Sequence, residues 1–304
     1  MADLEQFRWI IYAPTFDEYS GGAIALHRLC DLLNRGGVKS CLYPMALQTS
    51  KRKSFRCLRI MGKAILNKLF RTPYKTFDKF MTPLCDAFDP NNDIVVYPEI
   101  IVGNPLGAEN VVRWLLHEPG YFSGDFLFGK NDLFFYYQKA FLKETDIRNI
   151  GGELKIIYMQ DVYRKRNVHE RSGTCYILRK GKDRDIVHDL NDSVLIDGLP
   201  HAEIAEIFNR SEMCISYDMY TMYSRYAAAC GCLSIVVPEP AVDKYQWRPE
   251  EELRWGIAYG FDDVEWAKST QNKVLPSLMN QEKEANQASI DNFIQKCEMH
   301  FFKS

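Results

Sequence analysis

The sequence predicts a protein of the α/β class, built from two α/β/α domains that each enclose a parallel sheet. Two segments carry this prediction, residues 7–43 and 194–237, because in each of them buried strands alternate with helices across polar loops. A length of 304 residues is sufficient for two medium-sized domains with separate cores. Gly151 and Gly152 mark the expected boundary, which gives domains of residues 1–150 and 151–304.

The composition is that of an ordinary globular protein. Hydrophobic residues make up 46% and charged residues 26% of the chain, and no apolar run approaches the length of about 18 residues that a membrane span needs. The acidic N-terminus, residues 1–5, lacks the basic start and apolar centre of a signal peptide. The nine cysteines show no paired spacing, so we expect reduced thiols, no metal site and a cytoplasmic location.

The first domain is expected to open with a buried strand over residues 7–13 and a helix that begins at Gly21 and Gly22. This helix ends at a glycine stop, residues 35–37, and a second buried strand follows at residues 38–43. A glycine pair before a helix is also compatible with a plain tight turn.

Two later strands of the first domain, residues 92–100 and 111–116, end in polar residues. The second closes at His117 and Glu118, after which a Pro-Gly pair stops the strand. Because ligands bind at the carboxyl ends of strands in open parallel sheets, His117 and Glu118 are candidate catalytic residues. A structural histidine is the alternative.

In the second domain, a short strand at residues 175–178 leads directly into Arg179-Lys180-Gly181-Lys182. Side chains of Arg179, Lys180 and Lys182 are suited to bind phosphate, because their charge-assisted hydrogen bonds neutralise a diphosphate leaving group. A basic surface hairpin is the alternative interpretation.

Residues 216–232 carry the most informative motif of the chain. Asp218 follows a buried strand, and a helix is predicted to open within the same polar loop. The backbone N–H groups near Thr221, Met222 and Tyr223 would then face the ligand crevice and could receive an anionic group such as a diphosphate. An ordinary strand–helix–strand core unit without a ligand is the alternative.

The order and spacing of these segments resemble the family-4 and related GT-B glycosyltransferases. The resemblance covers most of residues 7–43, 92–118 and 175–267. In that family an acidic residue follows the strand, and a Glu eight positions later precedes an Ala-x-Ala-Cys-Gly ending. Here Asp218 takes the first position, Tyr226 stands at the second, and the Cys-Gly ending is present.

The resemblance implies two Rossmann-like α/β/α domains that face each other across a cleft, with a C-terminal helix, residues 281–302, that crosses back to the first domain. It implies a retaining, metal-independent glycosyltransferase that needs no cofactor beyond its nucleotide-sugar co-substrate. The Gly21–Gly22 loop and the phosphate-binding residues above would hold the donor. Asp218 would bind hydroxyls of the donor sugar, Tyr226 would cover the ribose or base, and His117 would lie near the transferred sugar.

Two alternatives remain open at this stage. One is a transferase of the same architecture that uses a CMP-activated acid sugar or another donor. The other is a non-catalytic nucleotide-sugar-binding subunit that partners another glycosyltransferase, as the replacement of the second Glu by Tyr226 would suggest. The retained Arg-Lys-Gly-Lys run argues against a degenerate domain.

The net charge of −2 is distributed very unevenly, because residues 51–75 contain nine Lys or Arg and no acidic residue. Apolar residues recur at steps of three and four in the same segment, which predicts a basic amphipathic helix. Such a helix favours attachment to an anionic membrane surface. The residues expected to bind the membrane are Lys51, Arg52, Lys53, Arg56, Arg59 and Lys63.

A membrane-bound transferase would act on a lipid-linked oligosaccharide acceptor, in the synthesis of a surface polysaccharide such as lipopolysaccharide or capsule, at the inner face of the cytoplasmic membrane. A helix packed on its own domain with a solvated basic face is the alternative. Nucleic acid is not an expected partner, because the basic charge is confined to one segment and the acidic remainder would repel phosphate.

Overall fold

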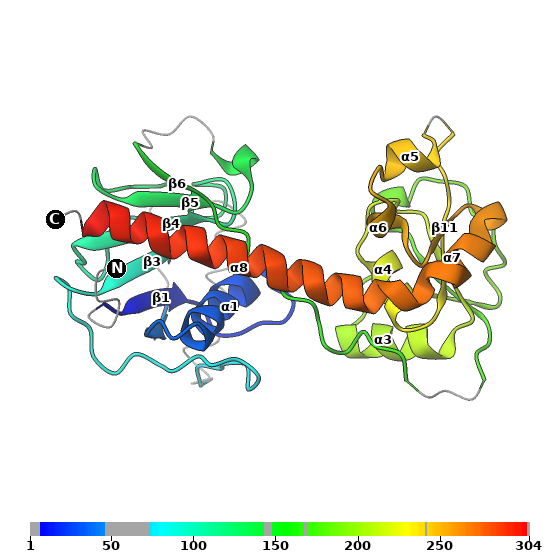
Figure 1. Cartoon of the computed structure of the whole chain (residues 1–304), viewed down its shortest axis with the longest axis horizontal. Coiled ribbons are helices and arrows are strands. Elements are labelled where there is room, and N and C mark those ends of the chain that lie inside the picture. Colours follow the sequence, from blue (N-terminus) through cyan, green and yellow to red (C-terminus); the bar gives the residue numbers. More distant parts are fainter. Residues whose placement is uncertain (1–6, 46–72, 143–147, 167–169, 241, 303–304) are drawn as a thin grey trace. The chain divides into compact units, whose positions relative to one another are not determined.

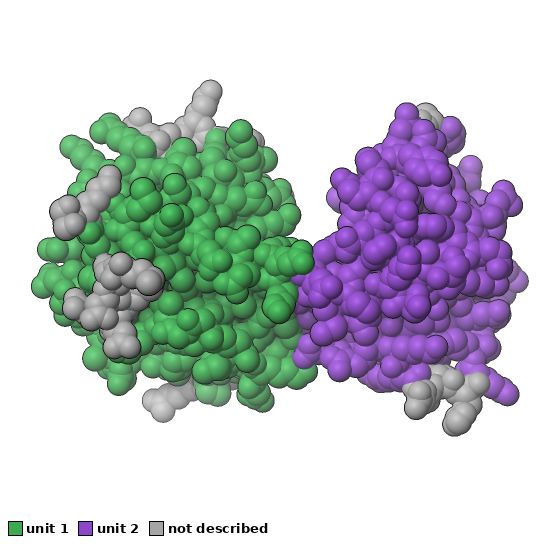
Figure 2. All heavy atoms as spheres, in the orientation of Figure 1, with its two compact units in different colours: residues 1–158, 283–304 green, residues 159–282 purple. Residues whose placement is uncertain are grey.

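The computed structural model describes residues 7–45, 73–142, 148–166, 170–240 and 242–302. The chain divides into two compact units (Figures 1 and 2). Unit 1 contains residues 1–158 and 283–304, and unit 2 contains residues 159–282. This division differs from the expected domains 1–150 and 151–304 in two ways. The chain passes from unit 1 to unit 2 after Tyr158, and it returns to unit 1 at Lys283.

Unit 1 is built on a six-stranded sheet in which every neighbouring pair of strands is parallel. The strand order is β2-β1-β3-β4-β5-β6. All residues of β1 and β3 are buried, as the apolar sequences predicted. The strands are β1 (Trp9–Ala13), β2 (Ser40–Pro44), β3 (Ile94–Pro98), β4 (Asn110–Leu115), β5 (Leu133–Tyr136) and β6 (Asn149–Glu153).

Helix α1 (Gly21–Arg35) covers this sheet and begins where the sequence predicted. The side chain of Ser20 caps the helix by accepting a hydrogen bond from the Ala23 N–H at 3.3 Å. Leu26, Leu29 and Leu33 face the core of unit 1. The helix ends where Gly36 N–H donates to the Leu32 carbonyl, which confirms the predicted glycine stop.

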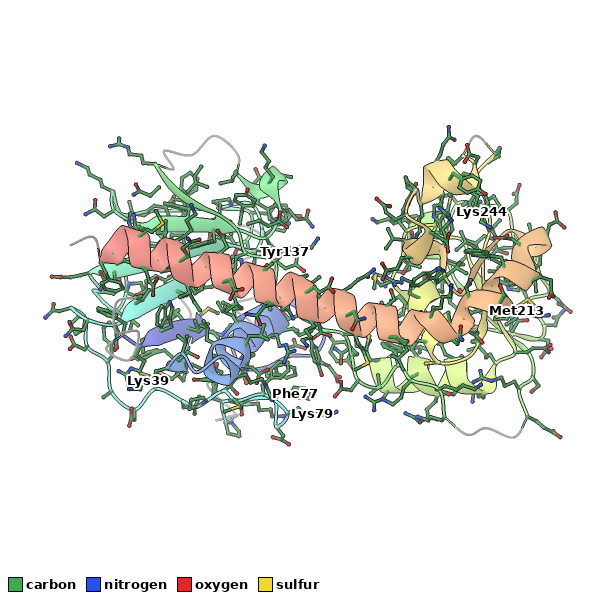
Figure 3. All side chains as sticks on the ribbon, viewed as in Figure 1. Lys39, Phe77, Lys79, Tyr137, Met213 and Lys244 are labelled. Carbon is green, nitrogen blue, oxygen red and sulfur yellow. The ribbon has the colours of Figure 1, made fainter. Side chains whose placement is uncertain are left out.

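Unit 2 contains a five-stranded parallel sheet in the order β11-β10-β9-β7-β8. Its strands are β7 (Thr174–Ile177), β8 (Ser193–Leu195), β9 (Met213–Ser216), β10 (Leu233–Val236) and β11 (Ile257–Tyr259). Its α-helices are α3 (His201–Arg210), α4 (Tyr223–Ala229), α5 (Lys244–Trp247), α6 (Glu251–Arg254) and α7 (Val264–Thr270). Figure 3 shows the side chains on this frame, with Tyr137 labelled in unit 1 and Met213 in unit 2. Both parallel sheets confirm the predicted α/β class.

The two sheets share one topological feature that positions ligands. In unit 1 the chain leaves β1 to form β2 on one side and β3 on the other, and in unit 2 it leaves β7 to form β8 and β9 in the same way. The loops that follow the two central strands therefore diverge at the carboxyl edge of the sheet, which is where open parallel sheets bind their ligands. These two switch points, β1/β3 and β7/β9, are the places to look for a site.

The C-terminal helix α8 (Val274–Phe301) takes part in both cores (Figure 1). Val274 and Leu278 are buried in a cluster of unit 2, whereas Phe293 and Cys297 are buried in the main core of unit 1. The side chain of Asn286 accepts from the Ile157 N–H at 2.7 Å and donates to the Ile157 carbonyl at 2.8 Å. The predicted return of the C-terminal helix to the first domain is confirmed.

A buried ion pair links β4 to the residue that precedes β5 in unit 1. Nε of Arg113 on β4 donates to Oδ2 of Asp132 at 2.7 Å, and the other guanidinium nitrogens donate to the carbonyls of Ile101 and Gly103 at 3.2 and 2.8 Å. The guanidinium also lies 5.0 Å from the centre of the Tyr97 ring. Each of the three guanidinium nitrogens of Arg113 therefore has a hydrogen-bond acceptor in the core, and the charge is balanced by Asp132.

The predicted basic helix lies almost wholly outside the described residues, including the six residues from Lys51 to Lys63 expected to bind the membrane. That helix and its membrane contact stay predictions. In the part of the chain that the structure describes, all eight cysteines are free thiols. Within the same residues, helices long and apolar enough to span a bilayer are absent.

Candidate functional site

At the β7/β9 switch point of unit 2, the Arg179–Gly181 turn lies directly against the end of β9. Gly181 is buried, and a Cβ atom at this position would overlap the carbonyl oxygen of Tyr217. Only glycine therefore lets the turn lie against the strand end. Arg184 fixes the same loop from its other end, because its guanidinium donates to the carbonyls of Tyr217 at 2.8 Å and Pro238 at 2.6 Å.

Arg179 has a strained backbone conformation, and its side chain lies beside the start of α4. Its φ angle of 41° lies in the left-handed region, which a residue other than glycine adopts at a cost. Its N–H donates to Oδ2 of Asp197 at 2.6 Å, and its guanidinium lies 5.1 Å from the centre of the Tyr223 ring. Tyr223 is the first residue of α4, so the structure brings Arg179 to the predicted helix start. Lys180 and Lys182 are exposed on the same turn.

The loop after β9 is folded on itself by its own polar side chains. Asp218 is only 6% exposed, and its Oδ1 accepts from the Tyr220 N–H at 3.1 Å. Ser216 Oγ donates to the Asp218 carbonyl at 2.8 Å, and the Tyr223 N–H donates to Thr221 Oγ1 at 3.3 Å. One carboxylate oxygen of Asp218 therefore caps its own turn. Its predicted role in binding sugar hydroxyls stays a prediction, as does anion binding by the amides near Met222.

Tyr226 belongs to an aromatic cluster beside this loop. Its ring stacks on Tyr163 with centroids 4.2 Å apart and planes 6° from parallel, and burial raises its pKa to about 12. Tyr163 O–H lies 2.6 Å from Nδ1 of His201, and the Tyr223 ring stacks on His201 at 6.1 Å. The predicted contact of Tyr226 with a ribose or base stays a prediction.

In unit 1, the β1/β3 switch point carries a carboxyl group that the sequence analysis did not select. Glu99 follows β3 directly, is 4% exposed, and accepts a hydrogen bond on Oε2 from the Leu116 N–H at 3.1 Å. Burial raises its pKa to about 7, although backbone N–H groups, including that of His117, act in the opposite direction. A carboxyl group with this pKa can exchange a proton near neutral pH.

His117 lies one residue beyond the backbone group that binds Glu99. Its ring packs among three aromatic rings, with centroid distances of 4.3 Å to Tyr121, 5.0 Å to Phe122 and 5.2 Å to Phe141. Its Nδ1 is buried and has no hydrogen-bond partner among the described residues. Glu118 is half-buried, and its carbonyl accepts from the Tyr121 N–H at 3.2 Å. The catalytic roles of His117 and Glu118 stay predictions.

Gly21 and Gly22 start α1 in unit 1, at the same edge as Glu99. A Cβ at Gly22 would contact only Leu116 Cδ1, at 3.7 Å, and a Cβ at Gly21 would meet nothing within 4 Å. Neither glycine is required by close packing, and donor binding by them stays a prediction. Groups of three or more His, Cys, Asp or Glu side chains able to hold a metal ion do not occur among the residues described.

Sequence reasoning found the switch point of unit 2 but missed several of its residues. Asp197 and His201 lie in and just after the loop between β8 and α3, whereas Tyr163 comes from a distant segment, and only the folded unit brings them to the ends of β7 and β9. For Glu99 a signal was present, because an acidic residue follows a fully buried strand, but its position at the switch point depends on the strand order.

No family model matches the sequence, and neither does any curated protein. Among solved structures, T4 phage β-glucosyltransferase in complex with UDP-glucose is 11% identical, with 94% of this chain and 98% of that chain covered and a TM-score of 0.48. An α-glucosyltransferase in complex with UDP and a 13-mer DNA is 11% identical, covers 97% and 95%, and has a TM-score of 0.40.

Sucrose-phosphate synthase from Thermosynechococcus elongatus is 10% identical over 97% of this chain and 94% of that chain, with a TM-score of 0.35. All three TM-scores lie below 0.5 and all identities lie far below 25%. Likeness at this level does not extend to substrate or mechanism. The function of this chain has to be inferred from its own residues.

Proposed function

We propose that this chain is a glycosyltransferase that moves a sugar from a nucleotide-sugar donor to a hydroxyl group of an acceptor. The observation that carries the proposal is the β7/β9 switch point of unit 2, where the strained Arg179 lies over Tyr223 at the start of α4. A guanidinium at the carboxyl edge of a parallel sheet is suited to bind the diphosphate of a nucleotide. Unit 2 is therefore assigned the donor and unit 1 the acceptor.

Glu99 supplies the general base in this proposal. With a pKa of about 7, its carboxylate can take the proton of the acceptor hydroxyl, while the hydroxyl oxygen forms the new bond to the anomeric carbon of the donor sugar. The bond between that carbon and the diphosphate oxygen breaks, and the nucleoside diphosphate leaves with the electron pair. Arg179 stabilises the charge on this leaving group, with Lys180 and Lys182 exposed on the same turn. The proposal uses no metal ion.

The stereochemical outcome distinguishes two versions of this reaction. Direct displacement assisted by Glu99 inverts the anomeric configuration, whereas the family-4 resemblance of the sequence implies retention. We propose inversion, because the buried carboxyl group of Glu99 provides a base for the displacement. The coupling constant of the anomeric proton of the product, measured by NMR, separates the two: inversion supports Glu99 as the base, and retention argues against it.

The phosphate contact gives a direct prediction for Arg179. Changing Arg179 to Ala removes a charge-assisted contact worth about 1.5–3 kcal/mol, so the affinity for the matching nucleotide should fall at least about tenfold. Calorimetric titration of the full chain measures this. Arg210→Gln is the matched control, because Arg210 is exposed at the end of α3 and should leave the affinity unchanged. Unchanged affinity in a folded Arg179→Ala variant would place the phosphate elsewhere.

The donor class is tested by nucleotide release from a panel of nucleoside-diphosphate sugars and CMP-sugars, with and without an acceptor. Release that depends on both Arg179 and an acceptor supports the proposal. Donor binding without release, for every acceptor offered, indicates a non-catalytic nucleotide-sugar-binding subunit. Release from CMP-sugars alone would replace the diphosphate donor by a CMP-activated acid sugar.

For the acceptor we propose a lipid-linked oligosaccharide at an anionic membrane surface, in surface-polysaccharide synthesis. The support is the basic composition of residues 51–75. Replacing Lys51, Arg52, Lys53 and Arg56 with Gln should lower co-sedimentation with anionic vesicles, because each basic residue near the surface contributes about 1 kcal/mol. Binding of the wild type should weaken as salt rises. Activity on a lipid-free acceptor should persist, and equal vesicle binding of both proteins would refute the membrane contact.

A further inference from the structure

The turn that carries Arg179 has a backbone conformation that arginine rarely adopts. The Gly181 N–H closes this turn by donating to the Leu178 carbonyl at 2.6 Å, and Arg179 lies inside it with a φ angle of 41°. Residues at positive φ are mostly glycine, and otherwise asparagine or aspartate. Among the described residues other than glycine, Arg179 alone has a positive φ. The surrounding structure must therefore impose this conformation.

Glycine would adopt the same conformation without strain, but it would lack the guanidinium. Arg179 is exposed, and its guanidinium lies 5.1 Å from the centre of the Tyr223 ring. In the part of the chain that the structure describes, Arg179 forms no ion pair with a carboxylate. Its charge is therefore open to an incoming anion, which gives a reason for arginine at a strained position.

Asp197 provides the hydrogen bond that holds the backbone of Arg179. Its Oδ2 accepts from the Arg179 N–H at 2.6 Å. Asp197 follows Ile196, which is buried and donates its N–H to the carbonyl of Tyr176 on β7 at 3.1 Å. The carboxylate is thus fixed to the end of β7 by the sheet itself. Because a hydrogen bond to a carboxylate is stronger than one between neutral groups, it offsets part of the cost of the left-handed conformation.

The carboxylate of Asp197 binds the main chain of Arg179 and not its guanidinium. Two further contacts act on the same residue, namely the Tyr223 ring beside the guanidinium and the close approach of Gly181 to the Tyr217 carbonyl. The other oxygen of Asp197, Oδ1, is buried and has no hydrogen-bond partner among the described residues. A direct contact of Oδ1 with a ligand is thus the alternative that an experiment has to separate from an effect through Arg179.

We propose that Asp197 is a positioning residue for Arg179, because its carboxylate holds the backbone in the conformation that presents the guanidinium to the diphosphate. The inference deepens the proposed function and rests on it in one respect, namely that Arg179 binds the diphosphate. Without this hydrogen bond, residue 179 returns mostly to ordinary conformations that carry the guanidinium elsewhere. The apparent affinity falls by the same factor as the population of the binding conformation, which we expect to be about tenfold.

Calorimetry on the full chain with inorganic pyrophosphate tests this role through two substitutions of one residue. Asp197→Ala and Asp197→Asn remove the same charge, but the asparagine oxygen can still accept from the Arg179 N–H. Asp197→Ala should bind pyrophosphate about tenfold more weakly than the wild type, and Asp197→Asn within about threefold of it. Asp185→Ala is the matched control, because it removes an exposed carboxyl group after the same turn and should leave the affinity unchanged.

A double substitution shows whether Asp197 acts through Arg179. In the Arg179→Ala background, Asp197→Ala should cause no further loss of affinity, because the guanidinium to be positioned is absent. A further loss of about tenfold would show that Asp197 acts on the ligand directly and would refute the positioning role. Asp197→Ala that binds as tightly as the wild type, or Asp197→Asn that binds as weakly as Asp197→Ala, would refute it as well.

An NMR measurement on the ligand-free chain covers the case in which Asp197→Ala does not fold. The Arg179 amide proton should resonate downfield in the wild type and shift upfield in Asp197→Asn, because an amide oxygen is a weaker acceptor than a carboxylate. An unshifted signal would refute the role of Asp197.

The fate of the proposed function is separable from that of this inference. If the wild type does not bind pyrophosphate, or Arg179→Ala binds it as tightly, the diphosphate site at Arg179 fails. The Arg179 amide signal then still decides whether Asp197 holds that backbone. If Arg179→Ala weakens binding and Asp197→Ala does not, the diphosphate site stands and the positioning role of Asp197 is refuted.

Discussion

Replacing Glu99 with Gln should lower kcat by about 10²–10⁴-fold, because the amide cannot accept the proton of the acceptor hydroxyl. The affinity for the donor should change little, since Glu99 lies in unit 1 and the diphosphate of the donor is proposed to bind Arg179 in unit 2. Steady-state kinetics for kcat and calorimetry for the donor affinity measure the two effects separately. An active Glu99→Gln variant would remove Glu99 from the reaction.

The pKa of Glu99 fixes the direction of the pH dependence. Since burial raises this pKa to about 7, the carboxylate form required of a base predominates only above that pH. The wild-type rate should therefore rise with pH through about 7 and level off above it. A rate that falls over the same interval would indicate that the protonated form is the active one.

The free energy of unfolding should change with pH in the direction opposite to the rate, because Glu99 is more stable in its neutral form. The folded pKa of about 7 lies above the ordinary value of 4.5, so the stability that the neutral form contributes is complete below pH 4.5 and is lost as pH rises through 7. Above pH 7 the wild type bears the cost of a buried carboxylate, up to about 3 kcal/mol. Glu99→Gln should therefore be more stable than the wild type at pH 8 while being almost inactive. A less stable variant at pH 8 would indicate a structural role for the carboxylate.

The largest loss of stability is expected from Asp132→Asn. Arg113 is fully buried, and the substitution leaves its guanidinium without a counter-ion in the core of unit 1. Removing one partner of such a pair costs about 3–5 kcal/mol, which denaturant unfolding of the full chain measures as a lower midpoint for unit 1.

Asp86→Asn is the matched control for this experiment. Asp86 is 92% exposed at its side chain and pairs with Arg8 at 3.8 Å, also in unit 1. Surface pairs of this kind contribute little, so the midpoint should barely change. Equal shifts of the unfolding midpoint in the two variants would show that the buried pair contributes no more stability than the surface pair.

Local sequence patterns predicted the elements of the fold well, since buried strands and glycine stops are encoded within a few residues. The strand over residues 7–13 appears as β1, and the helix expected after Gly21 and Gly22 appears as α1 with its stop at Gly36. The division between the units was harder to place. It depends on where α8 packs, and the contacts of Phe293 and Asn286 with the N-terminal part of unit 1, residues 1–158, are long-range in sequence.

In the candidate site, too, local sequence predicted some residues, whereas others depend on contacts that are distant in sequence. Arg179 was predictable because it follows a strand directly, and its neighbour Tyr223 because it starts a helix. Glu99 was missed because its raised pKa results from burial between strands that are distant in sequence.

Hydrogen–deuterium exchange of the full chain with and without a nucleoside diphosphate tests the central claim most directly. The claim is that the β7/β9 switch point of unit 2 binds the donor. The account predicts that the nucleotide slows exchange of backbone amides in residues 178–184 and 217–226, and that Arg179→Ala abolishes this protection at the same nucleotide concentration. Protection confined to other segments, or none at saturating nucleotide, would contradict it.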